Sequence, residues 1–222
     1  GGSFTSASAA RKNGKLLQTQ ITNPTNENET VAIIPDDPTQ AGDQSETIVS
    51  TRGSICSGAV IASNLVLTAA HCVQSVAEYA ISVEGATVKA ERIVLHPRFR
   101  MELFRARKPS PDLAILKLSS TLSANFRAVK LEREPFKPHP GERFTPAGFG
   151  VTSETDGSMP GKLRSVSLPA VGNTIDSTGI IMVRLSAGSD KSIGACIGDS
   201  GGPVFRGEKL AAIVAWSTGS GD

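Results

Sequence analysis

A short run of small residues near the carboxyl end of the chain contains the serine most suited to chemistry. Residues 198–203 read Gly-Asp-Ser-Gly-Gly-Pro. Glycine permits backbone conformations closed to other residues and lets another segment approach closely, so this run is poorly suited to the interior of a strand or helix. A serine nucleophile needs an exposed hydroxyl with bare backbone N–H groups beside it. Ser200 is therefore a candidate nucleophile, and a tight turn with an incidental serine is the alternative.

Two further motifs supply the groups that such a nucleophile requires. Residues 67–72 read Leu-Thr-Ala-Ala-His-Cys, and residues 112–118 read Asp-Leu-Ala-Ile-Leu-Lys-Leu. A serine hydroxyl is weak at neutral pH and needs an adjacent base, which His71 can supply. A carboxylate such as Asp112 can orient that imidazole. Together the three motifs predict nucleophilic catalysis.

With these motifs in this order, residues 33–216 resemble the trypsin/chymotrypsin-type serine peptidases. The resemblance implies an all-β fold of two six-stranded antiparallel Greek-key barrels, with the catalytic cleft between them. It implies an endopeptidase that forms an acyl-enzyme, with His71, Asp112 and Ser200 as catalytic residues. The oxyanion hole would be the backbone N–H groups of Gly198 and Ser200. Polypeptides are the implied substrates, a protein inhibitor or an activating protease are implied partners, and no cofactor or metal is expected.

The composition agrees with an all-β fold. The 22 glycines and 13 prolines are spread along 222 residues, which indicates many turns. Short runs rich in β-branched residues, at fairly regular spacing, favour barrels or sandwiches. These runs are residues 47–49, 59–61, 65–68, 93–95, 114–118, 180–185 and 210–215. The net charge of +2 gives no reason to expect a nucleic-acid partner, and no run approaches the length of a membrane-spanning helix.

The chain divides into a polar start and a peptidase domain. Residues 1–32 offer few apolar side chains, so we expect a flexible leader or propeptide. The peptidase domain would span residues 33–222, with the first barrel at about 47–118, a linker at about 119–140 and the second barrel at about 141–222. We also expect the family's last strand and C-terminal helix to be missing, which would leave a barrel edge exposed.

Three cysteines bear on the compartment. Cys56 and Cys72 flank the segment that leads to His71, and the resemblance implies that they form a disulfide. Two buried free thiols are the alternative. Because disulfides persist in oxidising compartments, we expect a secreted or periplasmic protein. Cys196 has no obvious partner in this sequence.

The start of the peptidase domain suggests activation by cleavage. Ile33 and the residues after it resemble the family's mature start, although Pro35 and Asp36 stand where two glycines are usual. Family members are cut before this point, and the new amine pairs with the aspartate before the serine, here Asp199. We therefore expect cleavage near Ala32-Ile33 and a zymogen switch formed by Ile33 and Asp199. The alternative is a plain strand, with Asp199 paired by another group.

The resemblance also locates a specificity pocket. Its floor would be Gly194, six residues before the serine, with Ala195 and Ile197 adding apolar surface. Trp216 and Ser217 would line its wall. The uncharged floor disfavours Arg and Lys at P1, and Ser217, which stands where the family commonly has glycine, would narrow the entrance. We therefore predict small or medium apolar P1 residues. Just before Asp112 lies a basic run that would border the substrate groove and could favour acidic substrates or partners, a solvated loop being the alternative. This run contains Arg98, Arg100, Arg105, Arg107 and Lys108.

Other functions are open to such a sequence. A catalytically silent homologue that acts as a protein-binding module is one, although such members usually lose a catalytic residue and this chain keeps all three. An HtrA-type protease, which needs no amino-terminal activation, is another, but Asp199 and the pair Cys56 and Cys72 argue against it. One departure from the family touches the site: Ala215 replaces a serine that helps to hold the aspartate, so a looser orientation of Asp112 is expected unless backbone donors compensate.

Overall fold

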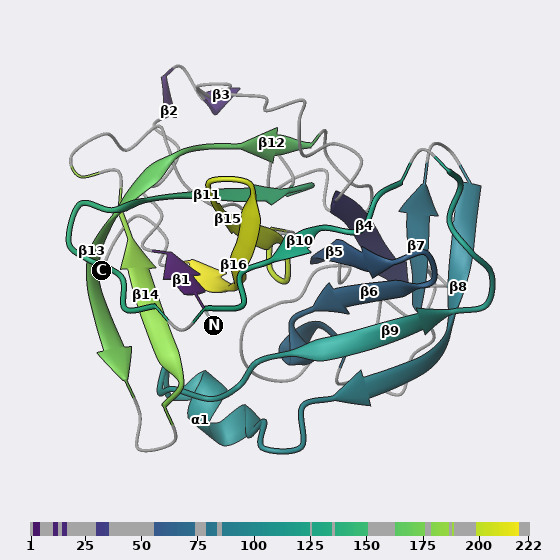
Figure 1. Cartoon of the computed structure of the whole chain (residues 1–222), viewed down its shortest axis with the longest axis horizontal. Helices are drawn as coiled ribbons and strands as arrows, with labels where there is room; N and C mark the ends of the chain where they lie inside the picture. Colours follow the sequence, from purple (N-terminus) through teal and green to yellow (C-terminus); the bar gives the residue numbers. More distant parts are fainter. Residues whose placement is uncertain are drawn as a thin grey trace.

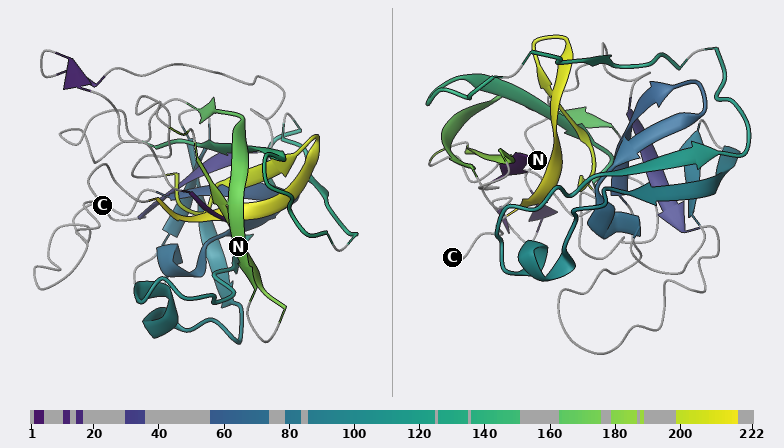
Figure 2. Two further views of the ribbon diagram at one scale, coloured as in Figure 1. Left: turned by 90° about the vertical axis from the view of Figure 1, so that its left-hand side faces the viewer. Right: turned by 60° about the horizontal axis from the view of Figure 1, so that its bottom comes forward.

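Strands dominate the computed structural model of this chain (Figure 1). It describes residues 2–4, 11–12, 15–16, 30–35, 56–73, 79–83, 86–124, 126–134, 136–150, 163–175, 179–186, 188 and 199–217. Two groups of strands lie side by side, one built from β4 to β9 and the other mainly from β11 to β16 (Figures 1 and 2). The expected all-β, two-barrel class is confirmed.

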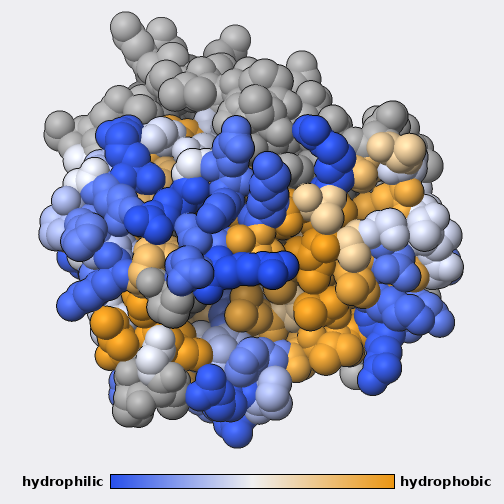
Figure 3. Space-filling view, in the orientation of Figure 1, coloured by the Kyte–Doolittle hydropathy of each residue, from blue (hydrophilic) through white to orange (hydrophobic). Residues whose placement is uncertain are grey.

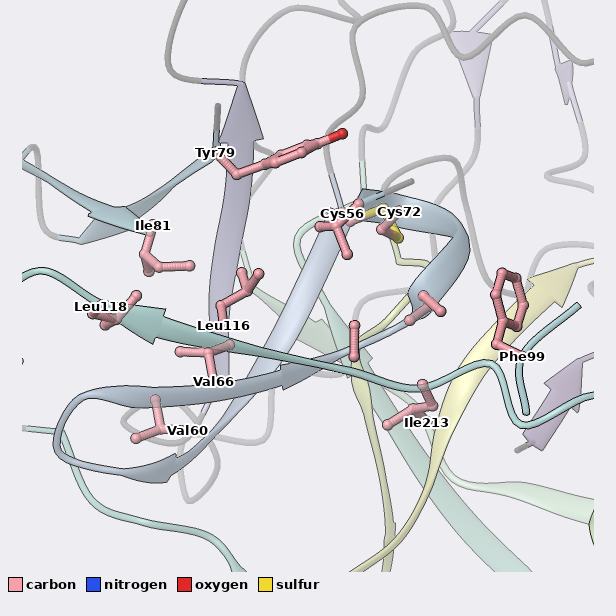
Figure 4. Packing of buried hydrophobic residues seen from close by; sticks show 14 of the residues in the cluster. Cys56, Val60, Val66, Cys72, Tyr79, Ile81, Phe99, Leu116, Leu118 and Ile213 are labelled. Carbon is pink, nitrogen blue, oxygen red and sulfur yellow. A yellow bond between two sulfur atoms is a disulfide. The ribbon is translucent and has the colours of Figure 1, made fainter. Parts of the chain in front are cut away.

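Six strands close into the first barrel in the order β4-β5-β6-β9-β8-β7, with every neighbouring pair antiparallel. Their bounds are β4 Thr30–Pro35, β5 Cys56–Ala62, β6 Leu65–Thr68, β7 Tyr79–Val83, β8 Ala86–Leu95 and β9 Ala114–Leu118. The period-two pattern of a strand explains the core. In β9, Leu116 is buried and Ile115 is exposed; Leu116 packs in one cluster with Val66 and Ile81 (Figure 4).

The second group of strands forms one sheet with the order β1-β14-β13-β11-β15-β16-β10, and β12 pairs with β11 beside this path. The bounds are β1 Gly2–Phe4, β10 Lys130–Leu131, β11 Arg143–Gly148, β12 Arg164–Ser165, β13 Leu168–Ile175, β14 Ile181–Leu185, β15 Pro203–Arg206 and β16 Lys209–Ser217. Two further short strands, β2 (Arg11–Lys12) and β3 (Lys15–Leu16), pair only with each other. The core of this sheet contains Phe144, Leu168, Leu185 and Val214.

The amino-terminal residues contribute to both groups of strands, which differs from the expected leader. β1 lies between β14 and β16 and runs parallel to both. Because β14 and β16 are the first and last strands of the run β14-β13-β11-β15-β16, β1 closes this run into a ring. β4 pairs with β5 and β7 and closes the first barrel. The first barrel therefore begins at Thr30 rather than at about residue 47, because β5 and β7 would otherwise each present an unpaired edge. The run expected at residues 47–49 lies outside the described residues.

A small apolar cluster joins the two groups of strands. Ala59 of β5 packs with Ala147 of β11 and with Phe205 of β15, and all three are almost fully buried. The first barrel's core also takes in Ile213 of β16 (Figure 4). Because these contacts fix one sheet against the other, side chains from both can be held at the junction. Among the described residues, the structure contains no helix long and apolar enough to cross a membrane.

A cluster of ion pairs connects the β15–β16 hairpin to residues of the linker and of the start of the second barrel. Arg206 Nε donates to Glu142 Oε1 at 2.6 Å, and its guanidinium lies 3.6 Å from Glu132 and 4.6 Å from the Phe136 ring centroid. Partial burial alone would raise the pKa of Glu142. The His139 backbone N–H and the Arg206 guanidinium outweigh that effect and lower the pKa below its ordinary value of 4.5.

We expect Glu142→Gln to lower the free energy of unfolding by about 1 kcal/mol at pH 7, since a charge-assisted hydrogen bond to Arg206 is weakened. A carboxyl whose pKa is depressed on folding stabilises above its unfolded pKa and loses that effect as the pH falls through the folded pKa. The difference between wild type and variant should therefore be full at pH 7 and shrink below about pH 4.5. Urea unfolding at several pH values measures this, and a pH-independent difference would contradict the assignment.

Candidate active site

The strand register of the first barrel places a histidine and an aspartate at the same rim. Thr68 at the end of β6 pairs with Ala114 at the start of β9. His71 follows Thr68 in the 3-10 helix η3 (Ala70–Val73), and Asp112 lies two residues before the start of β9. Antiparallel pairing therefore converts a separation of 41 residues into direct contact.

Two hydrogen bonds fix this pair. His71 Nδ1 lies 2.7 Å from Asp112 Oδ2, and the backbone N–H of His71 donates to Asp112 Oδ1 at 2.9 Å. Asp112 is 2 % exposed, so its carboxylate is held away from water with both oxygens engaged. An ionised Asp112 accepts a hydrogen bond from Nδ1–H, which keeps the proton on Nδ1 and leaves Nε2 with its lone pair as a base. The backbone N–H of His71 is therefore a donor that holds Asp112 although Ala215 lacks a hydroxyl.

The predicted disulfide between Cys56 and Cys72 is confirmed (Figure 4). It ties the start of β5 to η3, one residue beyond His71. Cys72 Sγ lies 3.8 Å from His71 Nε2, so the cross-link borders the imidazole directly. Among the described residues, Cys56, His71 and Cys72 are the one group spaced like metal ligands. With both sulfurs bound to each other, neither is a thiolate, and the group does not fit a metal ion.

Ser200 lies on the loop that enters β15, next to the first barrel. Its carbonyl accepts the N–H of Ser57 at 2.8 Å and lies 3.7 Å from Cys72 Sγ. Gly201 N donates to Val214 O at 2.8 Å, and Gly201 has φ +79°. The loop therefore brings Ser200 to the rim that holds His71 and Asp112. The hydroxyl of Ser200 does not hydrogen-bond to His71 Nε2 in this structure.

The segment that follows β11 holds the carboxylate of Asp199 by a backbone hydrogen bond. Gly150 N donates to Asp199 Oδ1 at 2.8 Å. A Cβ on Gly150 would lie 2.7 Å from Asp199 Cγ, so only glycine leaves room for the carboxylate. The predicted switch partner Ile33 lies inside β4, in register with Cys56 and Ile81. In the uncut chain Ile33 has no free amine, and the backbone N–H of Gly150 is one donor to the Asp199 carboxylate.

Most of the predicted specificity residues fall outside the described part of the chain. Gly194, Ala195, Ile197 and the oxyanion residue Gly198 all do. Trp216 and Ser217 form the end of β16, but their side chains are not described. The pocket and the oxyanion hole therefore stay predictions from the sequence.

Sequence reasoning missed Ser57, which connects the two groups of strands. This buried residue of β5 donates its backbone N–H to Ser200 O, and its Oγ accepts the N–H of Phe149 at 2.9 Å. The carbonyl of Ser57 also accepts a hydrogen bond from the Thr68 hydroxyl, with 2.9 Å between the two oxygens. The available signal was a hydroxyl residue beside Cys56 in an otherwise apolar strand.

We expect Ser57→Ala to leave the Phe149 N–H without its acceptor and to lower the free energy of unfolding by about 1–3 kcal/mol. Because Phe149 precedes Gly150, whose N–H holds Asp199 beside Ser200, the rate of active-site labelling should fall as well. Chemical unfolding and labelling kinetics measure the two effects. Ser119→Ala, at an exposed serine, is the control. Equal behaviour of the two variants would refute the role given to Ser57.

Sequence reasoning also missed a one-turn helix, α1 (Met101–Arg105), within the basic run. Its Phe104 stacks on His71, with ring centroids 4.3 Å apart and planes inclined by 15°. Met101 and Phe104 are both half-buried and three residues apart, the spacing of one helix face. That spacing was the signal for the helix.

A two-barrel β fold that holds a buried aspartate against a histidine, beside a serine in a glycine-rich loop, defines the chymotrypsin-like class of serine peptidases. The family model described as Trypsin matches residues 32–222. The chain belongs to the trypsin family.

Individual relatives agree with this assignment. The chain is 31 % identical over 188 residues to Trypsin Blo t 3 of Blomia tropicalis, covering 74 % of this chain and 68 % of the relative. It is 32 % identical over 185 residues to Trypsin alpha-4 of Lucilia cuprina, with the same two coverages.

Solved structures share the fold. Neuropsin, a serine protease expressed in the limbic system of mouse brain, superposes with a TM-score of 0.63 at 19 % identity, covering 90 % of this chain and 86 % of that one. Kallikrein-related peptidase 10, in a complex with Zn²⁺, gives a TM-score of 0.58 at 22 % identity, with coverages of 87 % and 83 %. At these identities the likeness concerns the fold alone.

Proposed function

We propose that this chain is a serine endopeptidase that cleaves polypeptides through an acyl-enzyme on Ser200. The observation that carries the proposal is the pair of hydrogen bonds, 2.7 and 2.9 Å long, by which the buried Asp112 holds His71. Burying the Asp112 carboxylate costs desolvation free energy. In return, the carboxylate stabilises the imidazolium that forms when His71 takes a proton.

In the proposed reaction, His71 Nε2 takes the proton of Ser200 as Oγ attacks the scissile carbonyl. The oxyanion that forms would be stabilised by the backbone N–H groups of Gly198 and Ser200. His71 then gives the proton to the leaving amine, and a water activated by the same imidazole hydrolyses the ester. Because the Oγ–Nε2 hydrogen bond is not formed in this structure, a rotation of the Ser200 side chain or a shift of its loop must precede attack.

Activation and location belong to the same proposal. Cleavage near Ala32-Ile33 would free the amine of Ile33 to pair with Asp199. Because that peptide bond lies inside β4, the strand must leave the barrel before or after the cut. The disulfide between Cys56 and Cys72 supports an oxidising compartment and therefore a secreted or periplasmic protein. An uncharged Gly194 floor supports small or medium apolar P1 residues.

A fluorophosphonate probe tests the proposal. The serine oxygen attacks its phosphorus and displaces fluoride only where a base activates the hydroxyl. Wild type cleaved before Ile33 should be labelled, and faster than the uncut chain, whereas Ser200→Ala should not be labelled in either form. Peptides with alanine or valine at P1 should be cleaved faster than otherwise identical peptides with arginine. Absence of labelling in every form would refute the peptidase proposal and favour the silent binding module.

A further inference from the structure

The helix α1 connects the catalytic imidazole to a strongly basic segment. Residues 98–108, called the basic loop below, contain five cationic side chains and one carboxylate, in a chain whose net charge is only +2. Phe104 on this loop stacks directly on His71. α1 lies at the lower edge of Figure 1, and hydrophilic residues lie at the lowest part of the same view in Figure 3.

Three cations of the basic loop are free to meet a ligand. Arg105, Arg107 and Lys108 are all exposed. Among the residues that the structure describes, none of the three side chains has an ion pair or hydrogen bond. Arg100 differs, because its Nη1 folds back onto the carbonyls of Pro97 and Phe99 at 3.2 and 2.9 Å.

The end of α1 holds these cations in a fixed relation to Phe104. Arg107 N donates to Phe104 O at 2.9 Å, and Lys108 N donates to Leu103 O at 2.8 Å. This is the Schellman pattern of a helix C-terminus, in which the residue just past the helix is usually glycine. Arg107 occupies that position with φ +54° and is the one non-glycine residue with positive φ in the described part of the chain. Arg107 thus occupies a backbone conformation that favours glycine. Because this conformation carries a cost in stability, we take it as an indication that the Arg107 side chain has a function.

We infer that the basic loop is a specificity element that selects polypeptides with acidic side chains within a few residues of the scissile bond. The inference rests on the proposed function. An extended peptide advances about 3.3–3.6 Å per residue, so side chains two to four positions from the scissile carbonyl lie about 7–14 Å away. Because Phe104 contacts the imidazole, we infer that the long cationic side chains one to four residues beyond it reach these flanking positions. A carboxylate there gains attraction that a matched amide does not.

Binding to the Ser200→Ala protein tests the inference without requiring turnover. Two fluorescent peptides would share one sequence and differ only in carrying Glu or Gln at the flanking positions on both sides of the bond. The Glu peptide should bind more tightly, and Arg105→Gln with Arg107→Gly should reduce the preference by about threefold for each charge removed, as for exposed ion pairs. Glycine suits the φ of Arg107, so the change is expected to preserve the loop. Salt near 1 M, where the Debye length is about 3 Å, should abolish the preference.

Removal of two distant charges is the matched control. Arg133→Gln with Lys137→Gln changes the net charge equally at exposed positions outside the basic loop, and should leave the ratio of the two affinities unchanged. Equal binding of the two peptides, or equal loss in both double variants, would overturn the inference. In the labelling-competent enzyme, the ratio of kcat/KM for the two peptides should follow the ratio of affinities. A protein that prefers the Glu peptide but never reacts with the fluorophosphonate would keep this inference and refute the peptidase proposal.

Discussion

Asp112→Asn is expected to lower kcat by about 10⁴-fold, the loss known for the same change in a serine-protease triad. The physical reason lies in the two hydrogen bonds that Asp112 makes to His71, 2.7 Å to Nδ1 and 2.9 Å to the backbone N–H. An amide has one accepting oxygen. If that oxygen keeps the backbone N–H, the amide NH₂ faces Nδ1 and favours the tautomer in which Nε2 carries the proton. Such an imidazole cannot accept the proton of Ser200.

The rate of fluorophosphonate labelling and the hydrolysis of an alanine-P1 peptide measure this effect. Glu142→Gln is the control, because it makes the same carboxylate-to-amide change in the charge cluster of Arg206, away from the site. Its kcat/KM should stay within about twofold of wild type, since distant sites act independently. A loss below about tenfold for Asp112→Asn would show that the pair does not serve catalysis.

Gly201→Ala is expected to destabilise the fold by about 3 kcal/mol or more and to abolish labelling of Ser200. Two costs combine at this position. Gly201 has φ +79°, which side chains rarely adopt. Its added Cβ would also overlap Thr68 Oγ1 and approach Ser57 O to 2.5 Å and Ala69 N to 2.9 Å. Because these atoms belong to β5, to β6 and to the turn before His71, relief would push the Ser200 loop away from the histidine.

Gly207→Ala separates the two costs. Gly207 also has a positive φ, +60°, but nothing lies within 4 Å of an added Cβ. It should therefore lose only the backbone part, about 1–2 kcal/mol, and keep its labelling rate. Thermal unfolding combined with labelling gives both quantities for each variant. Similar losses at Gly201 and Gly207 would show that the close approach to the first barrel is not maintained in solution.

The stretches that the sequence predicted well are local. The runs at residues 65–68 and 114–118 match β6 and β9 residue for residue, because buried β-branched and aliphatic side chains in short runs favour strands regardless of their partners. The motif around His71 is equally readable, because it depends on residue type and neighbouring residues. The pairing of Cys56 with Cys72 followed from the family resemblance, and the structure confirms it.

Several contacts could not have been predicted, because they depend on which strands become neighbours. Nothing in residues 2–4 indicates that β1 would lie parallel between β14 and β16, and the polar surroundings of residues 30–35 concealed a barrel strand. The roles of Ser57 and Phe104 likewise arise from tertiary contacts. Ser57 accepts a hydrogen bond from Phe149, and Phe104 stacks on His71.

Taken by itself, the amino-acid order determined the family, the strand-rich character and the identity of the candidate nucleophile, base and carboxylate. The tertiary structure alone decided that His71 and Asp112 are hydrogen-bonded, that the backbone of Ser57 holds the serine loop and that Phe104 of the basic loop stacks on the imidazole. The physical reason is strand register. A shift of one residue between β6 and β9 would turn every side chain to the opposite face, and only packing of the whole barrel selects the pairing that brings imidazole and carboxylate together.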